Sequence, residues 1–581
     1  MRKEKVKLTG AEIVVEELKN EGVEVAFGIP GGVLLDLYNV LYGDDTILHI
    51  LMRHEQCAAH AADGYARVSG NPGVCIATSG PGATNLVTGL ANANMDSAPV
   101  VALTGQVLTA AIGTNAFQEA STFTITMPVT KHNFMVKRTE DLPKVIHNAF
   151  YIANTGRKGV VLVDLPKDVL ATRVEVDLHQ RETFAGYKPR TKPNKAQIKK
   201  AAEALANAER PVILAGGGVI STDAAEELRH LAEFLGAPVV TTLIGKGAIP
   251  EDHPFSLGMA GMHGRIYANR VIYECDALLA LGTRFSDRLT GWQLDQFAPD
   301  AKLIHVDIDA AEINKNIQVD IPIVGDAKLT IADIIKSLEK KKRADMNAGK
   351  GKNLSVWVQR IKEMHSACDE CIKDVGRTGS SISDRFIKEI SAILDDNAIV
   401  TTEVGQCQMF AAHYYITKKP RTFISSGGLG TMGFGFPAAI GAKVAAPDRK
   451  VLDIAGDGSF LMTCQDLATC VENDIPVVVC IFNNCYLGMV RQWQELFFDK
   501  KYSHTCLGRT TDFVKLVEAF GGYGERVEKP EELKDALHNA FASGKPAVID
   551  MIVGWDDKIL PMIPPGGGLT GMIGTERCKN I

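Results

Sequence analysis

Residues 451–459 read Val-Leu-Asp-Ile-Ala-Gly-Asp-Gly-Ser, and residues 477–484 read Val-Val-Val-Cys-Ile-Phe-Asn-Asn. Each stretch begins as an apolar run that predicts a buried strand, and residues 460–473 between them have helical spacing. A strand–helix–strand unit of about 30 residues joins parallel strands. Because neighbouring strands lie about 4.8 Å apart, we expect Asp457 and Asn484 to emerge side by side at one sheet edge.

These polar residues predict a metal-bound diphosphate. One carboxylate and one amide oxygen suit Mg²⁺ or Ca²⁺, which take oxygen ligands. Gly456 and Gly458 allow the backbone to approach a phosphate, and Ser459 opens a helix whose N-terminus favours an anion. Either motif alone is consistent with ordinary turn chemistry, but the pair, each ending its own strand, favours the binding site.

The rest of the chain repeats the pattern of apolar strand and helix, which predicts an α/β fold of three doubly wound parallel-sheet domains. Two polar stretches, residues 187–194 and 340–352, read as linkers, the second alternatively as an exposed helix end. They divide the chain into an N-terminal domain (1–186), a central domain (195–339) and a C-terminal domain (353–581). The other expected strands are 74–78, 100–104, 160–165, 211–215, 277–281, 303–307 and 399–403.

Composition excludes several classes of protein. The 581 residues carry a net charge of −6 with no long basic run, so nothing favours nucleic acid. The first residues have no apolar core of signal-peptide type, and no stretch reads as a membrane span. The 12 cysteines are scattered without a secreted framework, which predicts a cytoplasmic protein. His365, Cys368 and Cys371 read as an ordinary helix face, with a metal or redox role as the alternative.

In the first domain, Glu55 opens a helix of small residues over 57–68. By itself it reads as a first-turn carboxylate favoured by the helix dipole. The Gly/Pro turn at 78–85 follows an expected strand, and residues 28–32 form a similar loop.

Taken together, these segments resemble thiamine-diphosphate enzymes. The resemblance implies that Asp457, Asn484 and the carbonyl of Tyr486 hold the cation, Mg²⁺. It also implies that Glu55 hydrogen-bonds N1′ of the aminopyrimidine and so helps to activate the cofactor. The loops near the cofactor would contribute Pro30, Gly80, Pro81 and Asn85.

Longer motifs narrow the resemblance to the large catalytic subunit of the acetohydroxyacid synthase family. They are residues 112–119, 130–133, 427–433 and 487–493. This family decarboxylates pyruvate on thiamine diphosphate and ligates the hydroxyethyl carbanion to pyruvate or 2-ketobutyrate. The products, 2-acetolactate or 2-aceto-2-hydroxybutyrate, feed branched-chain amino-acid synthesis.

The resemblance also implies a role for each position. Gly430 and Met432 would hold the pyrimidine, with Met432 propping the cofactor into a bent shape. Arg288 would pair with the carboxylate of the second ketoacid through its two-pronged guanidinium. Trp493 would favour 2-ketobutyrate by contact with its extra methyl, although alone it reads as a core or surface aromatic. Other residues implied to hold the diphosphate or to line the substrate side are Val404, Gly405, Gln406, Gly488 and Met489, and Phe117, Gln118 and Lys131.

The central domain predicts a dinucleotide. A glycine run at 216–218 follows an apolar strand, as a phosphate-binding loop would, although the run by itself favours a simple turn. Acidic residues end a later strand, where ribose hydroxyls often bind. In the family that the chain resembles, this domain binds FAD, although the reaction as a whole involves no net redox change. The FAD residues predicted are Gly216, Gly217, Gly218, His263, Gly282, Thr283, Arg284, Asp287, Asp307, Ile308 and Asp326.

Some positions depart from the family pattern, namely Ile29, Leu108, Ser286, Cys407 and Phe410. Cys407 stands where a histidine near the diphosphate is usual, which predicts a weaker contact there. These departures do not change the predicted class of reaction, but they weaken the prediction of which ketoacid is the substrate. Alternatives are a related thiamine-diphosphate carboligase, decarboxylase or pyruvate oxidase, or a non-catalytic homologue, against which the intact Glu55 and Asp457 argue.

The family also implies partners. Its active site lies between two chains, so we expect a homodimer or a dimer of dimers with shared active sites. A small regulatory subunit is implied as well.

Overall fold

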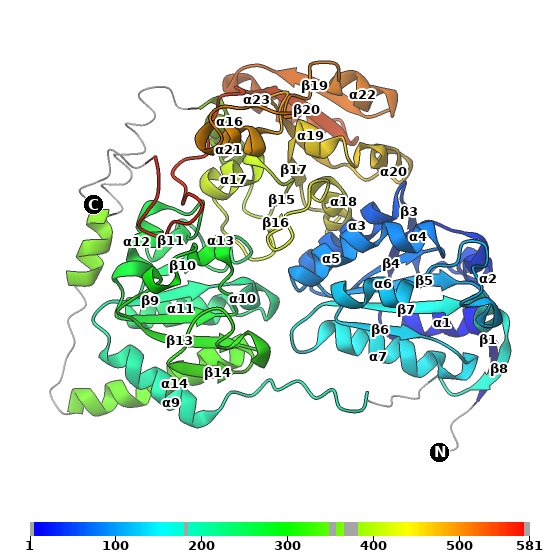
Figure 1. The fold of residues 1–581 in the computed structure, drawn as a ribbon, viewed down its shortest axis with the longest axis horizontal. Helices are drawn as coiled ribbons and strands as arrows, with labels where there is room; N and C mark the ends of the chain where they lie inside the picture. The colour runs from blue at the N-terminus through cyan, green and yellow to red at the C-terminus, as the bar shows by residue number, and fades with distance from the viewer. Residues whose placement is uncertain (1–4, 179–183, 348–355, 365–380, 575–581) are drawn as a thin grey trace.

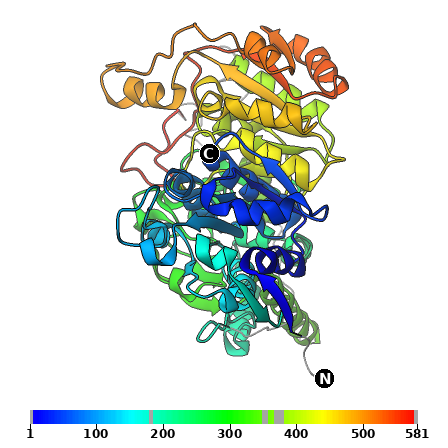
Figure 2. The ribbon, with the colours of Figure 1, turned by 90° about the vertical axis from the view of Figure 1, so that its right-hand side faces the viewer.

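The computed structural model describes residues 5–178, 184–347, 356–364 and 381–574. Its core is three six-stranded sheets, with a further two-stranded sheet of β1 (Val6–Thr9) and β8 (Arg173–Val176). Figure 1 shows one body for each large sheet, the C-terminal body lying above the other two. Figure 2, turned by 90°, again shows the C-terminal body on top. The α/β fold predicted from the sequence is confirmed.

The N-terminal sheet has the order β3-β2-β4-β5-β7-β6, and every pair in it is parallel. The order reverses on either side of β4, so polar turns after the strands gather at its carboxyl edge. Its strands are β2 (Val25–Gly28), β3 (Leu48–Leu51), β4 (Gly73–Ala77), β5 (Val100–Gln106), β6 (His132–Met135) and β7 (Val160–Pro166). Its longer helices are α1 (Gly10–Asn20), α2 (Leu35–Tyr42), α3 (Glu55–Ser69), α5 (Val87–Met95) and α7 (Leu142–Asn154).

The central sheet has the order β11-β10-β9-β12-β13-β14 and is parallel throughout. Its strands are β9 (Pro211–Ala215), β10 (Val239–Thr241), β11 (Ser256–Met259), β12 (Ala277–Leu281), β13 (Lys302–Asp307) and β14 (Ile321–Val324). Its helices are α9 (Lys195–Asn207), α10 (Gly217–Ser221), α11 (Ala225–Leu235), α12 (Ile266–Glu274), α13 (Asp287–Thr290) and α14 (Ala327–Asn347).

The C-terminal sheet, β16-β15-β17-β18-β20-β19, is also parallel throughout. Its strands are β15 (Ile399–Thr402), β16 (Phe423–Ser425), β17 (Val451–Gly456), β18 (Val478–Asn483), β19 (Tyr523–Val527) and β20 (Ala547–Ile552). Its helices are α16 (Ile382–Ile393), α17 (Gln406–Tyr414), α18 (Gly435–Ala445), α19 (Asp457–Phe460), α20 (Leu467–Glu472), α21 (Gly488–Phe497), α22 (Phe513–Ala519) and α23 (Leu533–Ala542).

The outer domains share one hydrophobic core. Helix α3 of the N-terminal domain packs directly on α18 of the C-terminal domain (Figure 1). The helices approach so closely that a Cβ on Gly441 would lie 1.8 Å from the carbonyl oxygen of Ala61, so only glycine fits. This contact fixes the two domains relative to each other.

Two predictions of local structure need correction. The single helix expected over 460–473 is broken into α19, a 3₁₀ turn at Cys464–Asp466 and α20. At the break, the Asp466 carboxylate accepts hydrogen bonds from the backbone of Arg53 (2.9 Å) and from the Thr469 hydroxyl (3.0 Å), so the segment adapts to the N-terminal domain. The segment expected as a linker at 340–352 is helical as far as Asn347, in line with the alternative prediction of a helix end, and its remaining residues lie outside the described ranges.

Other predictions stay open. His365, Cys368 and Cys371 lie outside the described residues, and the domain boundaries remain predictions. Within the described ranges, no helix combines the length and apolar character needed to cross a membrane.

Candidate active site

The carboxyl edge of the C-terminal sheet brings Asp457 to the loop of Asn484, as the sequence predicted. β17 and β18 are parallel neighbours, with Gly456 opposite Phe482. The Asp457 carboxylate accepts hydrogen bonds from the backbone N–H of Gly458 (2.9 Å) and of Cys485 (2.7 Å). Burial raises the pKa of this carboxyl group to about 6. A buried carboxylate of this kind is favoured when a cation binds beside it.

A second set of contacts orients the Asn484 loop. The Asn484 side-chain oxygen accepts the Tyr486 N–H (2.9 Å), while its amide faces the Gln406 oxygen at 3.5 Å. Gln406 in turn donates to the Gln492 oxygen (2.9 Å) and to the Asp557 carbonyl (2.8 Å). Among the described residues, no group of three His, Cys, Asp or Glu side chains could hold a metal. A cation here would therefore depend on one carboxylate with amide and carbonyl oxygens, the set predicted from Asp457, Asn484 and Tyr486.

Ser459 lies at the start of α19, as predicted, and its hydroxyl is engaged by protein groups. Its hydroxyl donates to the buried Glu403 carboxylate (2.5 Å) and accepts the Gly433 N–H (3.0 Å). Only its backbone N–H, at the start of α19, is left to face a diphosphate. Glu403 was not singled out from the sequence, because a glutamate at a strand end carries no distinctive spacing.

Glu403 lies beside a second buried carboxyl, Asp453, and burial raises the pKa of both groups. Glu403 accepts the backbone N–H groups of Gly433 (2.8 Å) and Phe436 (3.0 Å). It therefore fixes the backbone on the C-terminal side of Met432. The buried Cys407 thiol donates to the Glu403 carbonyl at 3.7 Å, so it lies against the same strand end.

The carboxyl edge of the N-terminal sheet forms a second group. Glu55 begins α3 and accepts a hydrogen bond from the Asn85 amide (2.9 Å). Gly80 adopts φ +60°, and a Cβ there would lie 2.8 Å from the Gln118 carbonyl oxygen. The turn at 78–85 therefore joins Glu55 to the loop of Gln118, and Pro81 opens the short helix α4 (Pro81–Asn85).

Phe117, beside Gln118, is 87% exposed, which is unusual for so large an apolar side chain. Leu108, Ile112 and Met127 on neighbouring segments are also exposed. An apolar surface of this kind is typical of a region that another surface covers.

The prediction for Lys131 is wrong about its surroundings. Lys131 precedes β6, at the amino edge of the sheet, whereas Glu55 and Gly80 follow strands at the carboxyl edge. Its ammonium donates to the carbonyl of Thr155 and to the Tyr187 hydroxyl (2.7 and 2.8 Å), and burial lowers its pKa to about 7. The lysine at the carboxyl edge is Lys167, which is exposed directly after β7.

One cavity of about 610 Å³ lies where the central and C-terminal domains meet, with part of its lining, including Asp96 and Arg157, from the N-terminal domain. Its volume lies in the range typical of cofactor sites. On the thiamine and substrate side it is lined by the predicted residues Arg288, Val404, Gly405, Gly430, Met489 and Trp493. On the central side it is lined by the predicted residues Gly217, Gly218, His263, Gly282, Thr283, Arg284, Asp287, Asp307 and Ile308.

The central side of this cavity fits a dinucleotide. The His263 ring is buried, and its Nδ1 has no hydrogen-bond partner among the described residues. Asp307 ends β13, and burial raises the pKa of its carboxyl group to about 6. A ribose hydroxyl could donate to such a carboxylate. Two further predicted FAD residues lie beside the cavity lining and stay predictions. The Asp326 side chain accepts the Leu329 N–H (3.0 Å) at the start of α14, and Gly216 precedes Gly217 in the same turn.

Arg288 and Trp493 face the cavity from two domains. The Arg288 guanidinium lies 3.3 Å from Asp287 and over the Trp292 ring, and its side chain is 56% exposed, so it is accessible to a carboxylate. The Trp493 Nε1 is buried, and no residue in the described part of the chain hydrogen-bonds to it. Glu55, Gln118, Asp457 and Asn484 do not line this cavity.

Comparisons with known proteins agree with this arrangement. Three domains of the thiamine pyrophosphate enzyme family match: the N-terminal TPP binding domain over residues 8–125, the central domain over 198–334 and the C-terminal TPP binding domain over 403–551. The chain is 51% identical to a probable acetolactate synthase large subunit of Methanocaldococcus jannaschii, covering 97% of this chain and 95% of that protein.

The chain belongs to the acetolactate synthase large-subunit family.

Two further relatives support membership of the same family. An acetolactate synthase of Mycobacterium bovis is 50% identical over 96% of this chain and 90% of its own length. The acetolactate synthase large subunit of Haemophilus influenzae is 42% identical over 98% of both chains. As a member of the acetolactate synthase family, the chain is a thiamine-pyrophosphate-dependent enzyme, and the family predicted from its motifs is confirmed.

Proposed function

We propose that the protein condenses pyruvate with a second pyruvate or with 2-ketobutyrate, giving 2-acetolactate or 2-aceto-2-hydroxybutyrate. The observation that carries this proposal is the cavity in which Arg288 and Trp493 meet the predicted cofactor residues Gly430 and Met489. A guanidinium there can pair with the acceptor's carboxylate, and an indole can contact its alkyl group. Membership of the acetolactate synthase family supports the same reaction.

Thiamine diphosphate would supply the chemistry that makes the carbonyl carbon of pyruvate a nucleophile. The protein's part is to hold and orient the cofactor. Asp457, Asn484 and the Tyr486 carbonyl would bind Mg²⁺ and through it the diphosphate, with the N–H groups at the start of α19. Glu55 would hold a proton against the aminopyrimidine, and its hydrogen bond from Asn85 fixes its position.

We propose that the cavity's central side binds FAD. The unpartnered Nδ1 of His263 and the buried Asp307 carboxylate support this proposal, together with the cavity's size. FAD would not be reduced or oxidised in this reaction, because joining two ketoacids with loss of CO₂ needs no oxidant. The rival activity, a pyruvate oxidase, would use the flavin as an oxidant.

A product assay separates these activities. With pyruvate, thiamine diphosphate, Mg²⁺ and FAD, we expect acetolactate without oxygen uptake, and a further product when 2-ketobutyrate is added. Acetyl phosphate or peroxide as the main product would contradict the proposal. An inactive protein that still binds thiamine diphosphate would favour a non-catalytic homologue.

The site would be completed by a second copy of the chain. Glu55 and Asp457 lie at the edges of two different sheets, and Phe117 beside the first edge is 87% exposed. We propose that Glu55 of one chain faces Asp457 of the other across a homodimer or within a dimer of dimers. Mixing inactive E55Q and D457N chains should then restore about a quarter of the wild-type activity, because half of randomly paired dimers carry one intact site. No recovery after subunit exchange would contradict a shared site.

A small regulatory subunit and a cytoplasmic location complete the proposal. The first rests on relatives named as large subunits. The second rests on the scattered free cysteines, most of which are buried.

A further inference from the structure

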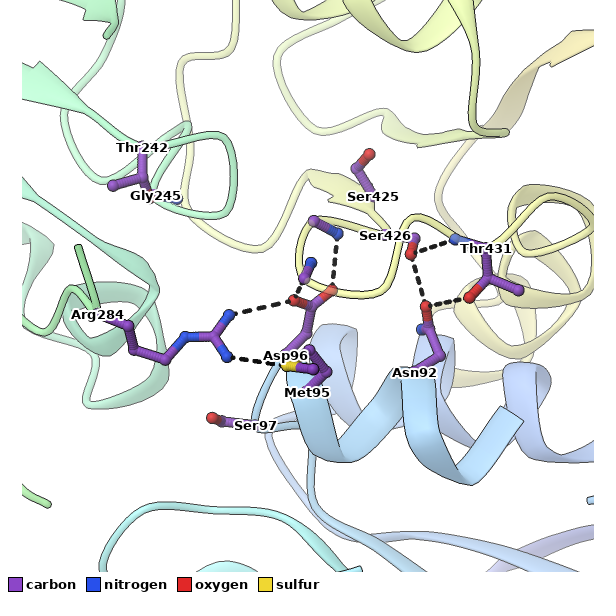
Figure 3. Close-up of polar contacts among 12 residues, drawn as sticks. Asn92, Met95, Asp96, Ser97, Thr242, Gly245, Arg284, Ser425, Ser426 and Thr431 are labelled. Atoms are coloured by element: carbon purple, nitrogen blue, oxygen red, sulfur yellow. Dashed lines mark hydrogen bonds and ion pairs between the residues drawn. The ribbon is translucent and has the colours of Figure 1, made fainter. Parts of the chain in front are cut away.

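A buried carboxylate, Asp96, connects all three domains at one point (Figure 3). It follows α5 of the N-terminal domain, and its side chain is fully buried. Its two oxygens accept the backbone N–H groups of Gly427 (2.8 Å) and Gly428 (2.7 Å) in the C-terminal domain. Two guanidinium groups also lie beside it, that of Arg67 in its own domain at 3.3 Å and that of Arg284 in the central domain at 3.8 Å.

The C-terminal partners of Asp96 belong to the segment 426–431, named here the clamp loop, which contains Gly430 and directly precedes Met432. A neighbouring residue of α5 holds the same loop at both ends. The Asn92 side-chain oxygen accepts the hydroxyls of Ser426 (2.6 Å) and Thr431 (3.0 Å). Figure 3 shows both bonds meeting at the Asn92 oxygen. The loop's position is therefore set by α5 of another domain.

Arg284 links this clamp to the nucleotide side of the cavity. Both Asp96 and Arg284 line the cavity, and the Arg284 side chain is 30% exposed. Its guanidinium also contacts the Met95 sulfur at 3.4 Å. A dinucleotide packed against Arg284 would exclude water from its exposed side. The attraction between its guanidinium and Asp96 would strengthen, because the effective dielectric constant around the pair would fall.

We propose that Asp96 is a positioning residue that couples occupancy of the nucleotide cavity to thiamine diphosphate binding through the clamp loop. FAD holds Arg284 against Asp96, and Asp96 holds the Gly427 and Gly428 amides, so the loop carrying Gly430 is ordered before the thiamine binds. Coupling between two sites is reciprocal, so thiamine diphosphate tightens FAD binding by the same factor. This inference rests on the proposed function and gives the flavin a task other than redox chemistry.

The test is a linkage measurement on the full-length protein. The dissociation constant of thiamine diphosphate with Mg²⁺ is measured by calorimetry without FAD and at saturating FAD. In the wild type we expect FAD to tighten binding about 5-fold or more, the lower end of typical coupling. In D96N the ratio should fall below about 2, because an amide cannot accept both backbone N–H groups and loses the charge that attracts Arg284.

A matched control is D141N, which removes a carboxylate of the same domain that pairs with Arg138 at the surface. It should keep the wild-type ratio.

Should D96N fail to fold, R284Q carries the test, since it leaves both bonds between Asp96 and the clamp loop in place and should still lower the ratio. A wild-type ratio near one, or an unchanged ratio in D96N or R284Q, would overturn the inference while leaving the proposed function standing. A wild type that binds neither cofactor would contradict both.

Discussion

The carboxyl edges of the N-terminal and C-terminal sheets differ in how far one chain completes them. Around Asp457 and Gln406, polar side chains bond to one another and to backbone groups. Around Glu55 and Gln118, Asn85 donates to the Glu55 carboxylate and Gly80 packs against Gln118, while Phe117 beside them is 87% exposed. The comparison teaches that the edge at Asp457, named here the closed edge, is organised by contacts within one chain, whereas the edge at Glu55, named here the open edge, leaves a large apolar side chain exposed. Under the proposed function the closed edge would hold the diphosphate and the open edge the pyrimidine.

The largest expected effect comes from the open edge. E55Q should reduce turnover by about 10²- to 10⁴-fold, the usual contribution of a positioned acid or base. Binding of thiamine diphosphate, measured by fluorescence quenching, should change little, because the closed edge holds the diphosphate. E140Q, at an exposed site of the same domain, is the control. Loss of cofactor binding in E55Q would contradict the proposal that the closed edge alone holds the cofactor.

The closed edge should show the opposite pattern. D457N removes the one carboxylate of the proposed cation set, so Mg²⁺-dependent binding of thiamine diphosphate should weaken on the order of 100-fold, which corresponds to about 2.7 kcal/mol. A calorimetric titration measures this, with exposed Asp448→Asn as the matched control. Unchanged affinity in D457N would show that the cation is held elsewhere.

We expect that neither edge sets the preference between the two acceptor ketoacids. W493L shortens the apolar contact in the cavity, so the preference for 2-ketobutyrate over pyruvate should fall about 10-fold, as expected for recognition of one methylene. Competition between the two acceptors, with both products quantified, gives this ratio. A changed ratio in E55Q instead of W493L would place specificity at the open edge.

The smallest expected effect is a pH dependence of the closed edge. Burial raises the pKa of Asp457 to about 6, so this carboxyl is charged above that pH and protonated below it. Because a cation binds the charged form, Mg²⁺ affinity should fall as the pH is lowered, by about twofold between pH 7 and pH 6. In D457N this component should vanish. A flat wild-type profile over this range would contradict the assignment of Asp457 as the ligand.

Much of this arrangement could be predicted from sequence. Apolar runs such as 211–215 and 277–281 are strands with the same bounds in the structure, since a run buried on both faces is unmistakable in a parallel sheet. The positions of Asp457, Asn484 and Glu55 after such strands allowed them to be predicted as site residues. Lys131 was misplaced because a motif does not say at which edge of the sheet its residue lies. Ser459 lies in a helix that follows its strand, as predicted, but the partner of its hydroxyl, Glu403, follows a different strand, β15.

The amino-acid sequence by itself determined the three parallel sheets, the chemical character of the two edges and the family to which the chain belongs. These follow from local periodicity and from short motifs whose residues are adjacent in the chain. Only the tertiary structure decided which side chains are free to bind and which are occupied by neighbours. It also revealed that Asp96 holds Gly427 and Gly428 across more than 300 positions of sequence. Hydrogen bonds of that kind depend on how the domains pack, and no local pattern specifies them.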